Sequence, residues 1–289
     1  MPKVSIVLPT YNGEKYIKES IDSVIHQTFT DWELIIVNDC STDSTPNIIK
    51  EYENIDSRIR IINNSQNLKL PKSLNVGFKS ASGEYLTWIS DDNLFLPQAI
   101  EAMVSYLETS NVDLVSCKYD EIDENGKLLN TIDKHNKRNL HRFLRRNVVG
   151  ACFMYTKKIA DKIGQYDENV FCAEDYDYWF RIALAGNIKF IPECYYQYRF
   201  NPYSLSSTKQ DLIKKKSLEV REKYVLKLMD KLNYSSHKKI KTLIELYKRN
   251  IDEKIWLKMA IDIDANEFIK SVFYYMFFYN IKLYLRKGK

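Results

Sequence analysis

The sequence predicts an α/β protein in which a doubly wound, mostly parallel sheet precedes a helical C-terminal appendage. Two observations support this fold class. Short apolar runs alternate with segments of helical periodicity over the first hundred residues, as in parallel sheets that carry helices on both faces. From about Thr208 the chain becomes rich in Lys, Leu, Ile and Tyr and has no glycine before Gly288, which favours long helices.

The predicted strands and helices follow one another in alternation. Continuous apolar runs, too short for helices, predict buried strands. They lie at residues 4–8, 34–37, 59–62, 85–89 and 113–117. Apolar residues that recur every three or four positions predict the intervening helices. These lie at 17–25, 48–52, 74–81 and 100–107. Residues 120–147 are polar and predict a hairpin or an irregular excursion, and a further helix is expected to open near Ala173.

The composition limits the possible functions. The chain has 289 residues and a net charge of +5, so its overall charge gives no reason to expect nucleic acid as a partner. The five cysteines are scattered without CxxC spacing, which argues against a disulfide framework or a zinc site, fits a reducing cytoplasm and predicts small buried thiols. The chain enters an apolar strand directly after Met-Pro-Lys and has no long apolar run, so neither export nor a membrane span is expected.

Polar residues cluster where three of the predicted strands end. The clusters lie at residues 9–13 (PTYNG), 38–43 (NDCSTD) and 90–93 (SDDN). In open α/β sheets ligands bind at the carboxyl ends of the strands, because loops there present polar groups without burying them unpaired. A binding site is therefore expected where these three clusters meet.

Asp91 and Asp92 have the most specific chemistry of these residues. Two adjacent carboxylates at a strand end can hold Mg²⁺ or Mn²⁺ while leaving coordination positions for phosphate oxygens. Asp is equally typical of turns and helix caps, so the pair by itself does not decide between a metal site and a turn. Asp39, taken alone, is more typical of a cap.

Five motifs, in order along the chain, make the sequence resemble the family 2 glycosyltransferases with a GT-A fold. They are VSIVLPTYN from Val4, ELIIVNDCSTD from Glu33, ASGEYLTWISDD from Ala81, GQYDENVFCAED from Gly164 and YRFNPYSLS from Tyr198. Each motif is weakly specific, but the five together cover roughly the first 205 residues. The resemblance implies a GT-A catalytic domain at 1–207, with a nucleotide-binding half (1–115) and an acceptor-binding half (116–207), before a helical region at 208–289.

The resemblance also implies which residues bind the nucleotide-sugar donor. Pro9 and Tyr11 would form the floor of the nucleotide pocket, with the Tyr11 ring against the base. Asp39 would accept a hydrogen bond from a base N–H group. Asp91 would face the ribose, and Asp92 would coordinate the Mg²⁺ or Mn²⁺ ion that bridges the diphosphate.

Catalysis of sugar transfer needs a base, because an acceptor hydroxyl is a poor nucleophile until its proton is removed. The resemblance implies that Asp175, the second acid of the Glu174-Asp175 pair, is this base. Asp177 is a rival, but residues two apart on a helix point in different directions, so only one of them is expected to meet the acceptor. Attraction of acids to the positive end of the helix dipole would also explain the pair.

The resemblance implies one further donor contact and a mechanism. Lys72 stands where the family often has a basic residue, which implies contact with phosphate, although a solvated helix face explains a lysine equally well. The implied mechanism is a single displacement at the anomeric carbon with inversion of configuration. The metal would assist the departure of the nucleotide diphosphate.

Two positions depart from the family pattern. Ile89 stands two residues before Asp91, where many relatives have a further Asp, so metal binding would depend on Asp92. Asn201 stands where relatives often have His, and an amide oxygen is a weaker ligand than a charged group. Both departures favour an alternative, a catalytically silent scaffold of the same fold that binds nucleotide or a partner protein. A dehydrogenase would need a G-x-G-x-x-G turn where Pro9-Thr-Tyr-Asn stands.

The expected function is therefore that of an inverting glycosyltransferase. It would move a sugar from a nucleotide-diphosphate sugar, with UDP favoured, to a hydroxyl of a growing polysaccharide or glycolipid. The expected partners are the donor and a saccharide or lipid-linked saccharide acceptor, and the expected location is the cytoplasm. Residues 266–289 are rich in aromatic and basic side chains, so this segment could lie on the inner face of the plasma membrane. Packing on the protein or on a second subunit of a homo-oligomer is the commoner fate of such a face.

Overall fold

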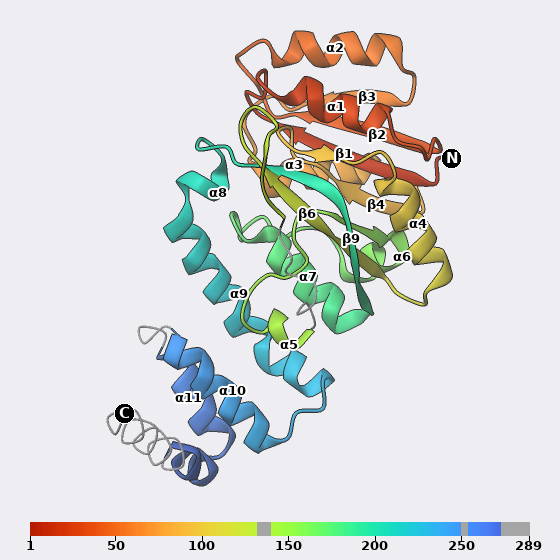
Figure 1. The fold of residues 1–289 in the computed structure, drawn as a ribbon. Helices are drawn as coiled ribbons and strands as arrows, with labels where there is room; N and C mark the ends of the chain where they lie inside the picture. Colours follow the sequence, from red (N-terminus) through yellow and green to blue (C-terminus); the bar gives the residue numbers. More distant parts are fainter. Residues whose placement is uncertain (132–139, 250–253, 273–289) are drawn as a thin grey trace, which may run out of the picture. The chain divides into compact units, whose positions relative to one another are not determined.

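The structure is a computed structural model that describes residues 1–131, 140–249 and 254–272. The chain divides into two compact units, 1–220 and 221–289. The first contains the sheet and its covering helices (Figure 1). The strands are β1 (Val4–Thr10), β2 (Trp32–Asn38), β3 (Ile59–Asn63), β4 (Tyr85–Trp88), β5 (Leu94–Phe95), β6 (Leu114–Ile122), β7 (Leu128–Thr131), β8 (Phe153–Thr156) and β9 (Ile188–Arg199).

The helices alternate with the strands in the first half of the chain and follow one another in the last. They are α1 (Ile17–Ile25), α2 (Thr45–Ile55), α3 (Leu70–Ser80), α4 (Ala99–Thr109), α5 (Leu140–Phe143), α6 (Lys157–Ile163), α7 (Glu174–Ala185), α8 (Leu205–Thr208), α9 (Gln210–Lys231), α10 (Ser236–Arg249) and α11 (Ile255–Ile263).

The sheet has the strand order β3-β2-β1-β4-β8-β6-β9-β5, with β7 paired to β6. The first four strands in this order run parallel. β8 enters antiparallel to both β4 and β6, and β9 returns parallel to β6. The predicted α/β class is confirmed. The prediction did not include β5, β8 and β9, because β5 and β8 are very short and β9 carries Pro192, a residue that is rare inside strands.

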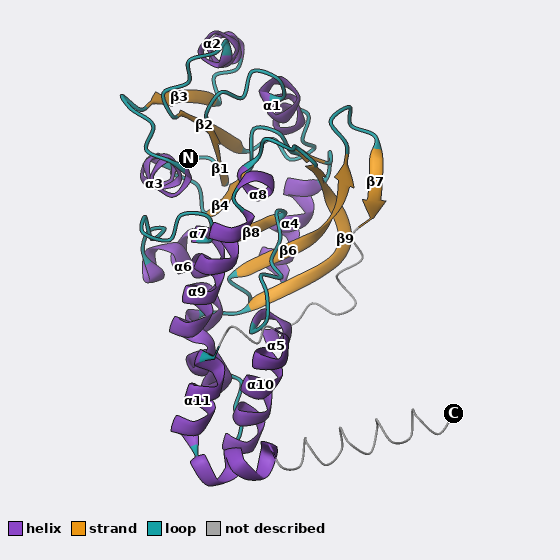
Figure 2. Ribbon diagram, turned by 90° about the vertical axis from the view of Figure 1, so that its left-hand side faces the viewer, coloured by secondary structure: helices purple, strands orange, loops and turns teal. Residues whose placement is uncertain are grey.

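Successive side chains of β1 point to opposite faces of the sheet, as they do in any strand. Ile6 and Leu8 belong to the main core, which also contains the apolar faces of α1, α2 and α4. Figure 2 shows these three helices on one side of the sheet and α3 on the other. A Cβ atom at Gly77 of α3 would lie 2.5 Å from Val7 Cγ1, so this glycine allows α3 to approach the second face closely.

The five thiols are all free, and only part of their prediction is confirmed. Cys117 and Cys152 are buried, as their apolar neighbours predicted. Cys40, Cys172 and Cys194 are half-buried instead. Cys40 and Cys172 lie in loops, where the chain turns away from the core, and Cys194 lies on β9 at the far side of the sheet order from β1.

The second unit is helical. The Trp256 side chain is fully buried in it, and the guanidinium carbon of Arg221 lies 5.4 Å from the centre of its ring. Within the described ranges, no helix is both long and apolar enough to cross a membrane. Of the predicted membrane-contact segment, residues 266–272 are helical, and 273–289 lie outside the described residues. The domain boundary expected at residue 207 remains a prediction.

Candidate active site

The topology brings together the carboxyl ends of three parallel strands. β1 lies between β2 and β4, so the chain leaves β1 in one direction for β2 and returns on the other side for β4. Such a switch in direction opens a crevice at the strand ends, because the flanking loops diverge. The three polar clusters found in the sequence follow these three strands.

Hydrogen bonds join the loop after β1 to the loop after β2. The backbone N–H of Asn12 donates to Ser41 Oγ (3.0 Å), and Asn12 Oδ1 accepts from the backbone N–H of Thr42 (2.8 Å). The backbone N–H of Gly13 donates to Thr45 Oγ1 at 2.9 Å. The small polar residues that the sequence places after both strands therefore hold the two loops against each other.

Four non-glycine residues around this edge have a left-handed backbone. Their φ angles are 56° at Asn12, 66° at Cys40, 68° at Lys69 and 73° at Cys172. For side chains other than Asn this conformation costs about 1–2 kcal/mol. The four lie in the loops after β1, β2 and β3 and just before α7, so the local strain of the first unit is concentrated at the candidate site, as is typical of functional loops.

Asp39 is buried and holds the loop that leads into α3. Its Oδ1 accepts hydrogen bonds from Asn64 Nδ2 (2.7 Å) and the backbone N–H of Leu68 (2.8 Å), and its Oδ2 accepts from the backbone N–H of Lys69 (2.9 Å). A carboxylate offers about four acceptor positions. One position therefore remains on Oδ2 for an N–H group of a ligand.

Asp91 lies at the end of β4 against the loop after β1. Its Oδ2 accepts a hydrogen bond from Thr10 Oγ1 at 2.6 Å. Burial and the neighbouring Asp92 carboxylate raise the pKa of Asp91 to about 7. A Cβ atom on Gly13 would lie 2.4 Å from Asp91 Oδ2, so only glycine at position 13 leaves room for this carboxylate.

Asp92 is fixed at both its backbone and its side chain. Its carbonyl oxygen accepts from Arg199 Nε at 2.9 Å, and its Oδ2 accepts from Asn201 Nδ2 at 3.2 Å. Burial raises its pKa, while the Asn201 hydrogen bond and the Arg199 charge oppose that shift. The described residues form no group of three His, Cys, Asp or Glu side chains that would enclose a metal. One or two carboxylates with phosphate oxygens and waters is nevertheless the donor set that Mg²⁺ uses with nucleotides, so Asp91 and Asp92 fit such an ion.

The other predicted donor residues lie in different surroundings. Pro9 is buried within β1, opposite Val37 of β2. Tyr11 follows β1 and is 50% exposed, so its ring is free to meet a base. The Lys72 side chain is 48% exposed on α3, and its Nζ lies 3.5 Å from Glu168 Oε2. Lys72 therefore lies on the solvated face of α3, beside Glu168.

Asp175 lies in the first turn of α7, where the helix dipole favours acids. Its Oδ2 accepts a hydrogen bond from Asn147 Nδ2 at 2.7 Å, and burial raises its pKa. Asp177 differs from it, because it is fully buried and paired with Arg181 Nε at 2.8 Å. The two acids are therefore distinguished by their surroundings, and Asp175 is the one that stays partly exposed.

The Tyr198 hydroxyl donates a hydrogen bond to Ser206 Oγ at 3.2 Å, and burial, together with the charges of Asp92 and Asp175, raises its pKa. The fold thus brings residues more than 80 positions apart in the sequence to one site. It also contains residues to which the sequence analysis gave no role, namely Thr10, Asn147 and the buried Arg199. Thr10 and Arg199 lie within two of the five motifs, but each of the three residues acts through a partner distant in the chain.

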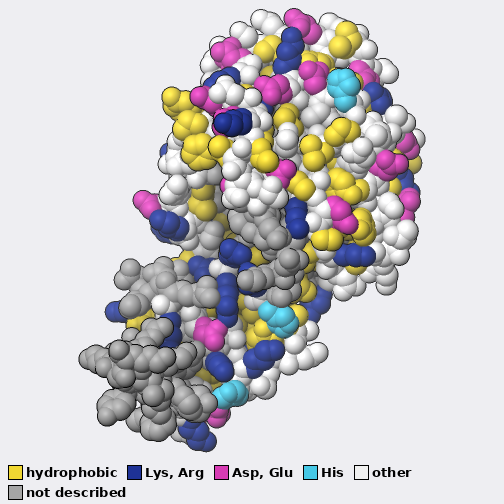
Figure 3. Space-filling view, in the orientation of Figure 1, with side chains coloured by type: hydrophobic (Ala, Val, Ile, Leu, Met, Phe, Trp, Pro, Cys, Tyr) yellow, Lys and Arg dark blue, Asp and Glu magenta, His cyan; other side chains and the backbone are white. Residues whose placement is uncertain are grey.

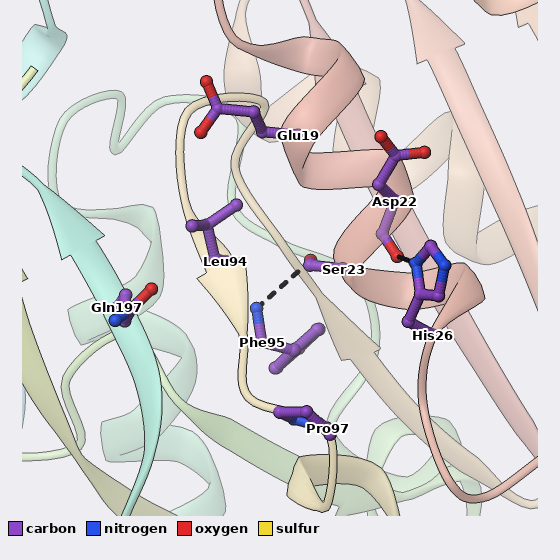
Figure 4. A pocket seen from close by; sticks show the side chains of 8 residues that line it. All are labelled: Glu19, Asp22, Ser23, His26, Leu94, Phe95, Pro97 and Gln197. Carbon is purple, nitrogen blue, oxygen red and sulfur yellow. Dashed lines mark hydrogen bonds between the residues drawn. The ribbon is translucent and has the colours of Figure 1, made fainter. Parts of the chain in front are cut away.

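A surface depression lies between α1 and β5 (Figure 4). It has a volume of about 340 Å³ and is lined by Glu19, Asp22, Ser23, His26, Leu94, Phe95, Pro97 and Gln197. None of the predicted donor or catalytic residues lines it. The backbone N–H of Phe95, in β5, donates to Ser23 Oγ, in α1, at 3.2 Å. The depression therefore lies where α1 packs against β5.

The fold is that of the GT-A glycosyltransferases. S. aureus TarS, solved as residues 1–349 with UDP-GlcNAc, superposes with a TM-score of 0.68 at 21% identity, over 93% of this chain and 79% of that one. The mannosyltransferase PcManGT of Pyrobaculum calidifontis, solved with GDP-Man and Mn²⁺, gives a TM-score of 0.57 at 16% identity, over 94% and 73%.

The chain belongs to glycosyl transferase family 2, whose family model matches residues 5–164. An uncharacterized glycosyltransferase of Methanocaldococcus jannaschii is 36% identical over 207 residues, which are 68% of this chain and 71% of that protein. TuaG of Bacillus subtilis, named as a proposed teichuronic acid biosynthesis glycosyltransferase, is 27% identical over 76% of this chain and 88% of its own. The protein is therefore a glycosyltransferase, and the predicted resemblance and fold are confirmed.

Proposed function

We propose that this glycosyltransferase moves a sugar with inversion from a nucleotide-diphosphate sugar to an acceptor hydroxyl, with Asp175 as the base. The observation that carries the proposal is the pair of acids Asp91 and Asp92, which Thr10 and Arg199 hold at the strand ends of a family 2 glycosyltransferase. Asp175, a carboxylate whose pKa burial raises, suits a proton acceptor. UDP is the first nucleotide to test, because the TarS structure contains UDP-GlcNAc.

In this proposal the strand-end residues bind and orient the donor. Asp39 accepts a base N–H at its remaining position, the Tyr11 ring lies against the base, Asp91 faces the ribose, and Pro9 supports them from within β1. A divalent ion on Asp92, Mg²⁺ or Mn²⁺, would neutralise the diphosphate. Lys72 contributes at most a weak phosphate contact, because Glu168 already pairs with it.

Asp175 takes the proton of the acceptor hydroxyl while that oxygen bonds to the anomeric carbon and the diphosphate oxygen leaves with its electron pair. Asn147 orients the Asp175 carboxylate. Because the attacking oxygen comes from the face opposite to the leaving group, the configuration inverts and the chain forms no covalent sugar intermediate.

We propose that the acceptor belongs to a cell-envelope polymer or glycolipid and that the protein works at the cytoplasmic face of a membrane. The name of TuaG supports the first part. Charge supports the second, since residues 221–289 carry 16 Lys and Arg against eight Asp and Glu, whereas residues 1–220 carry 27 against 30. Figure 3 shows dark blue side chains gathered over α9 and α10. A cationic surface of this kind suits anionic headgroups.

Donor binding is the direct test. Thermal unfolding is measured with UDP-, GDP-, CMP- and dTDP-sugars, with Mn²⁺ or with chelator, on wild type and D92A. A ligand at 100 times its Kd stabilises by about 2.7 kcal/mol, so a metal-dependent rise in Tm is expected for the correct donor and is absent in D92A. No rise with any donor would make a silent scaffold the better assignment.

Membrane contact has its own test. Full-length protein and a variant that lacks residues 266–289 are sedimented with vesicles of phosphatidylglycerol and phosphatidylcholine. The full chain is expected to bind and to dissociate in high salt, because headgroup attraction is screened. Equal binding by the truncated variant would refute the role of 266–289 and would leave the cationic helices of 221–249 to account for it.

A further inference from the structure

Arg199 is the most deeply buried cation of the described residues that lie near the strand-end acids, with 1% of its surface exposed. A buried charge is costly unless hydrogen bonds replace the water it loses. Arg199 is the last residue of β9, and a side chain at the end of a strand could have remained in solvent. Its burial therefore calls for a reason in its partners.

The partners of Arg199 come from three segments that are distant in the sequence. Nε donates to the carbonyl oxygen of Asp92 at 2.9 Å, and Nη2 pairs with Glu19 Oε2 on α1 at 2.6 Å. Nη1 donates to the carbonyl oxygen of Glu124, in the turn after β6, at 3.0 Å. The guanidinium carbon also lies 4.5 Å from the centre of the Tyr16 ring.

The same residue also holds the position after Asp92. The backbone N–H of Arg199 donates to Oδ1 of the buried Asn93 at 2.8 Å. Two successive residues of the strand-end loop are thus bound by one arginine, once through its side chain and once through its backbone. The Asp92 carboxylate extends from a peptide that is held on both sides.

We propose that Arg199 is a positioning residue, which fixes the Asp92 backbone so that the Asp92 carboxylate meets a divalent cation bound with the nucleotide. This inference rests on the proposed role of Asp92 as the metal ligand. A planar guanidinium carries its donors on three separate nitrogen atoms in a fixed fork. Lysine at this position keeps the charge, but all its donors lie on one nitrogen that cannot span the same partners, so the strand-end loop would lose its fixed geometry.

A purely structural role predicts something different from a positioning role. If Arg199 only stabilises the fold, replacing another buried arginine, with the same loss of stability, should weaken cation binding as much as R199K does. Arg181 offers that comparison, because it is also largely buried, pairs with Asp177 at 2.8 Å and donates to the carbonyl oxygen of Ile163 at 2.9 Å. None of these partners is a strand-end acid.

The experiment is a Mn²⁺ titration in the presence of saturating UDP, followed by the electron paramagnetic resonance signal of free Mn²⁺. Wild type, D92N, R199K and R181K are compared, with apo thermal unfolding of each variant. R199K is expected to bind one Mn²⁺ per chain with a Kd at least tenfold higher than wild type, while R181K keeps the wild-type Kd at a similar loss of Tm. A wild-type Kd in R199K, or an equal loss in R181K, would overturn the inference.

Two further variants separate the possible failures. D92N tests the metal role itself: if it binds Mn²⁺ as wild type does, the proposed role of Asp92 is wrong and the positioning inference falls with it. If R199K does not fold, E19Q decides, because Glu19 is 53% exposed and its loss frees one end of the guanidinium without opening the core. E19Q is expected to raise the Mn²⁺ Kd about threefold, and an unchanged Kd would count against positioning.

Discussion

Asp39 at the sheet edge receives three hydrogen bonds from the chain, whereas Glu174 at the start of α7 is just as buried and has an oxygen, Oε2, with no donor among the described residues. Asp175, next to Glu174, accepts from Asn147 Nδ2 and from the backbone N–H of Tyr176. The proposed donor half of the site thus holds Asp39 rigidly. The proposed acceptor half leaves Glu174 poorly solvated, and burial together with the charge of Asp175 raises the pKa of Glu174 to about 8.

This difference matches what the two halves have to do. A group that orients a donor works best when its geometry is fixed before binding. A group that accepts a proton works best when its pKa is close to the working pH, and desolvation raises a carboxyl pKa toward that range. The following experiments break or sharpen the comparison, beginning with the largest expected effect.

Replacing Asp175, the proposed base, should separate chemistry from binding. D175N is expected to lower the rate of sugar transfer by about 10³-fold, since general base catalysis contributes that order, while the Kd of the donor stays within about twofold of wild type. The measurement is transfer rate and donor binding on the same preparation. A variant that retains a tenth of the wild-type rate would show that another group takes the proton.

A single methyl group should damage the rigid half. G13A places a Cβ 2.4 Å from Asp91 Oδ2 and should weaken donor binding by at least tenfold. G186A is the matched control. Its Cβ would also lie 2.4 Å from a carboxylate, that of Asp113, but Gly186 follows the C-terminal end of α7, whereas Asp175 lies in the first turn of that helix. Calorimetric titration with the donor checks both variants. Equal losses in the two would mean that general instability, and not Asp91, causes the effect.

Asn147 should set the pKa of Asp175. Its hydrogen bond lowers the pKa of Asp175, so N147A raises that pKa further. The base must be ionised to act, and the acidic limb of the rate profile therefore moves to higher pH, with about a tenfold loss near neutrality that shrinks at alkaline pH. The pH dependence of the transfer rate measures this shift. An unmoved acidic limb would argue that Asn147 has no contact with the working base.

Asp91 should carry the smallest effect, one on stability. Its folded pKa of about 7 lies above its ordinary value of 3.8, so the folded state binds a proton that the unfolded state releases between these values. Its contribution to stability is therefore full at low pH and is lost as the pH rises through 7. D91N should be more stable than wild type at pH 8 and nearly equal to it at pH 4. Urea unfolding at both pH values tests it, and no difference at pH 8 would exclude a raised pKa.

The sequence by itself determined the repeating strand-helix pattern, the parallel half of the sheet and the edge at which polar loops gather. These features are local in origin: apolar runs of strand length, helical periodicity and turn residues act over short stretches of chain. The motifs that contain Asn12, Asp39 and Asp92 also lie on this part of the chain. The family could be recognised for the same reason, because each of its motifs is a run of consecutive residues.

The tertiary structure alone decided which residues support that site. Thr10 binds Asp91, Asn147 binds Asp175 and Arg199 binds Asp92. These partners are too far apart in the sequence for a helical or strand period to indicate the pairing. It also separated Asp175 from Asp177, because burial and the Arg181 ion pair depend on how α7 packs and not on the order of its residues. Pairing between distant side chains is fixed only when the sheet order brings their elements together, and that is why the sequence indicated the acids but not the groups that hold them.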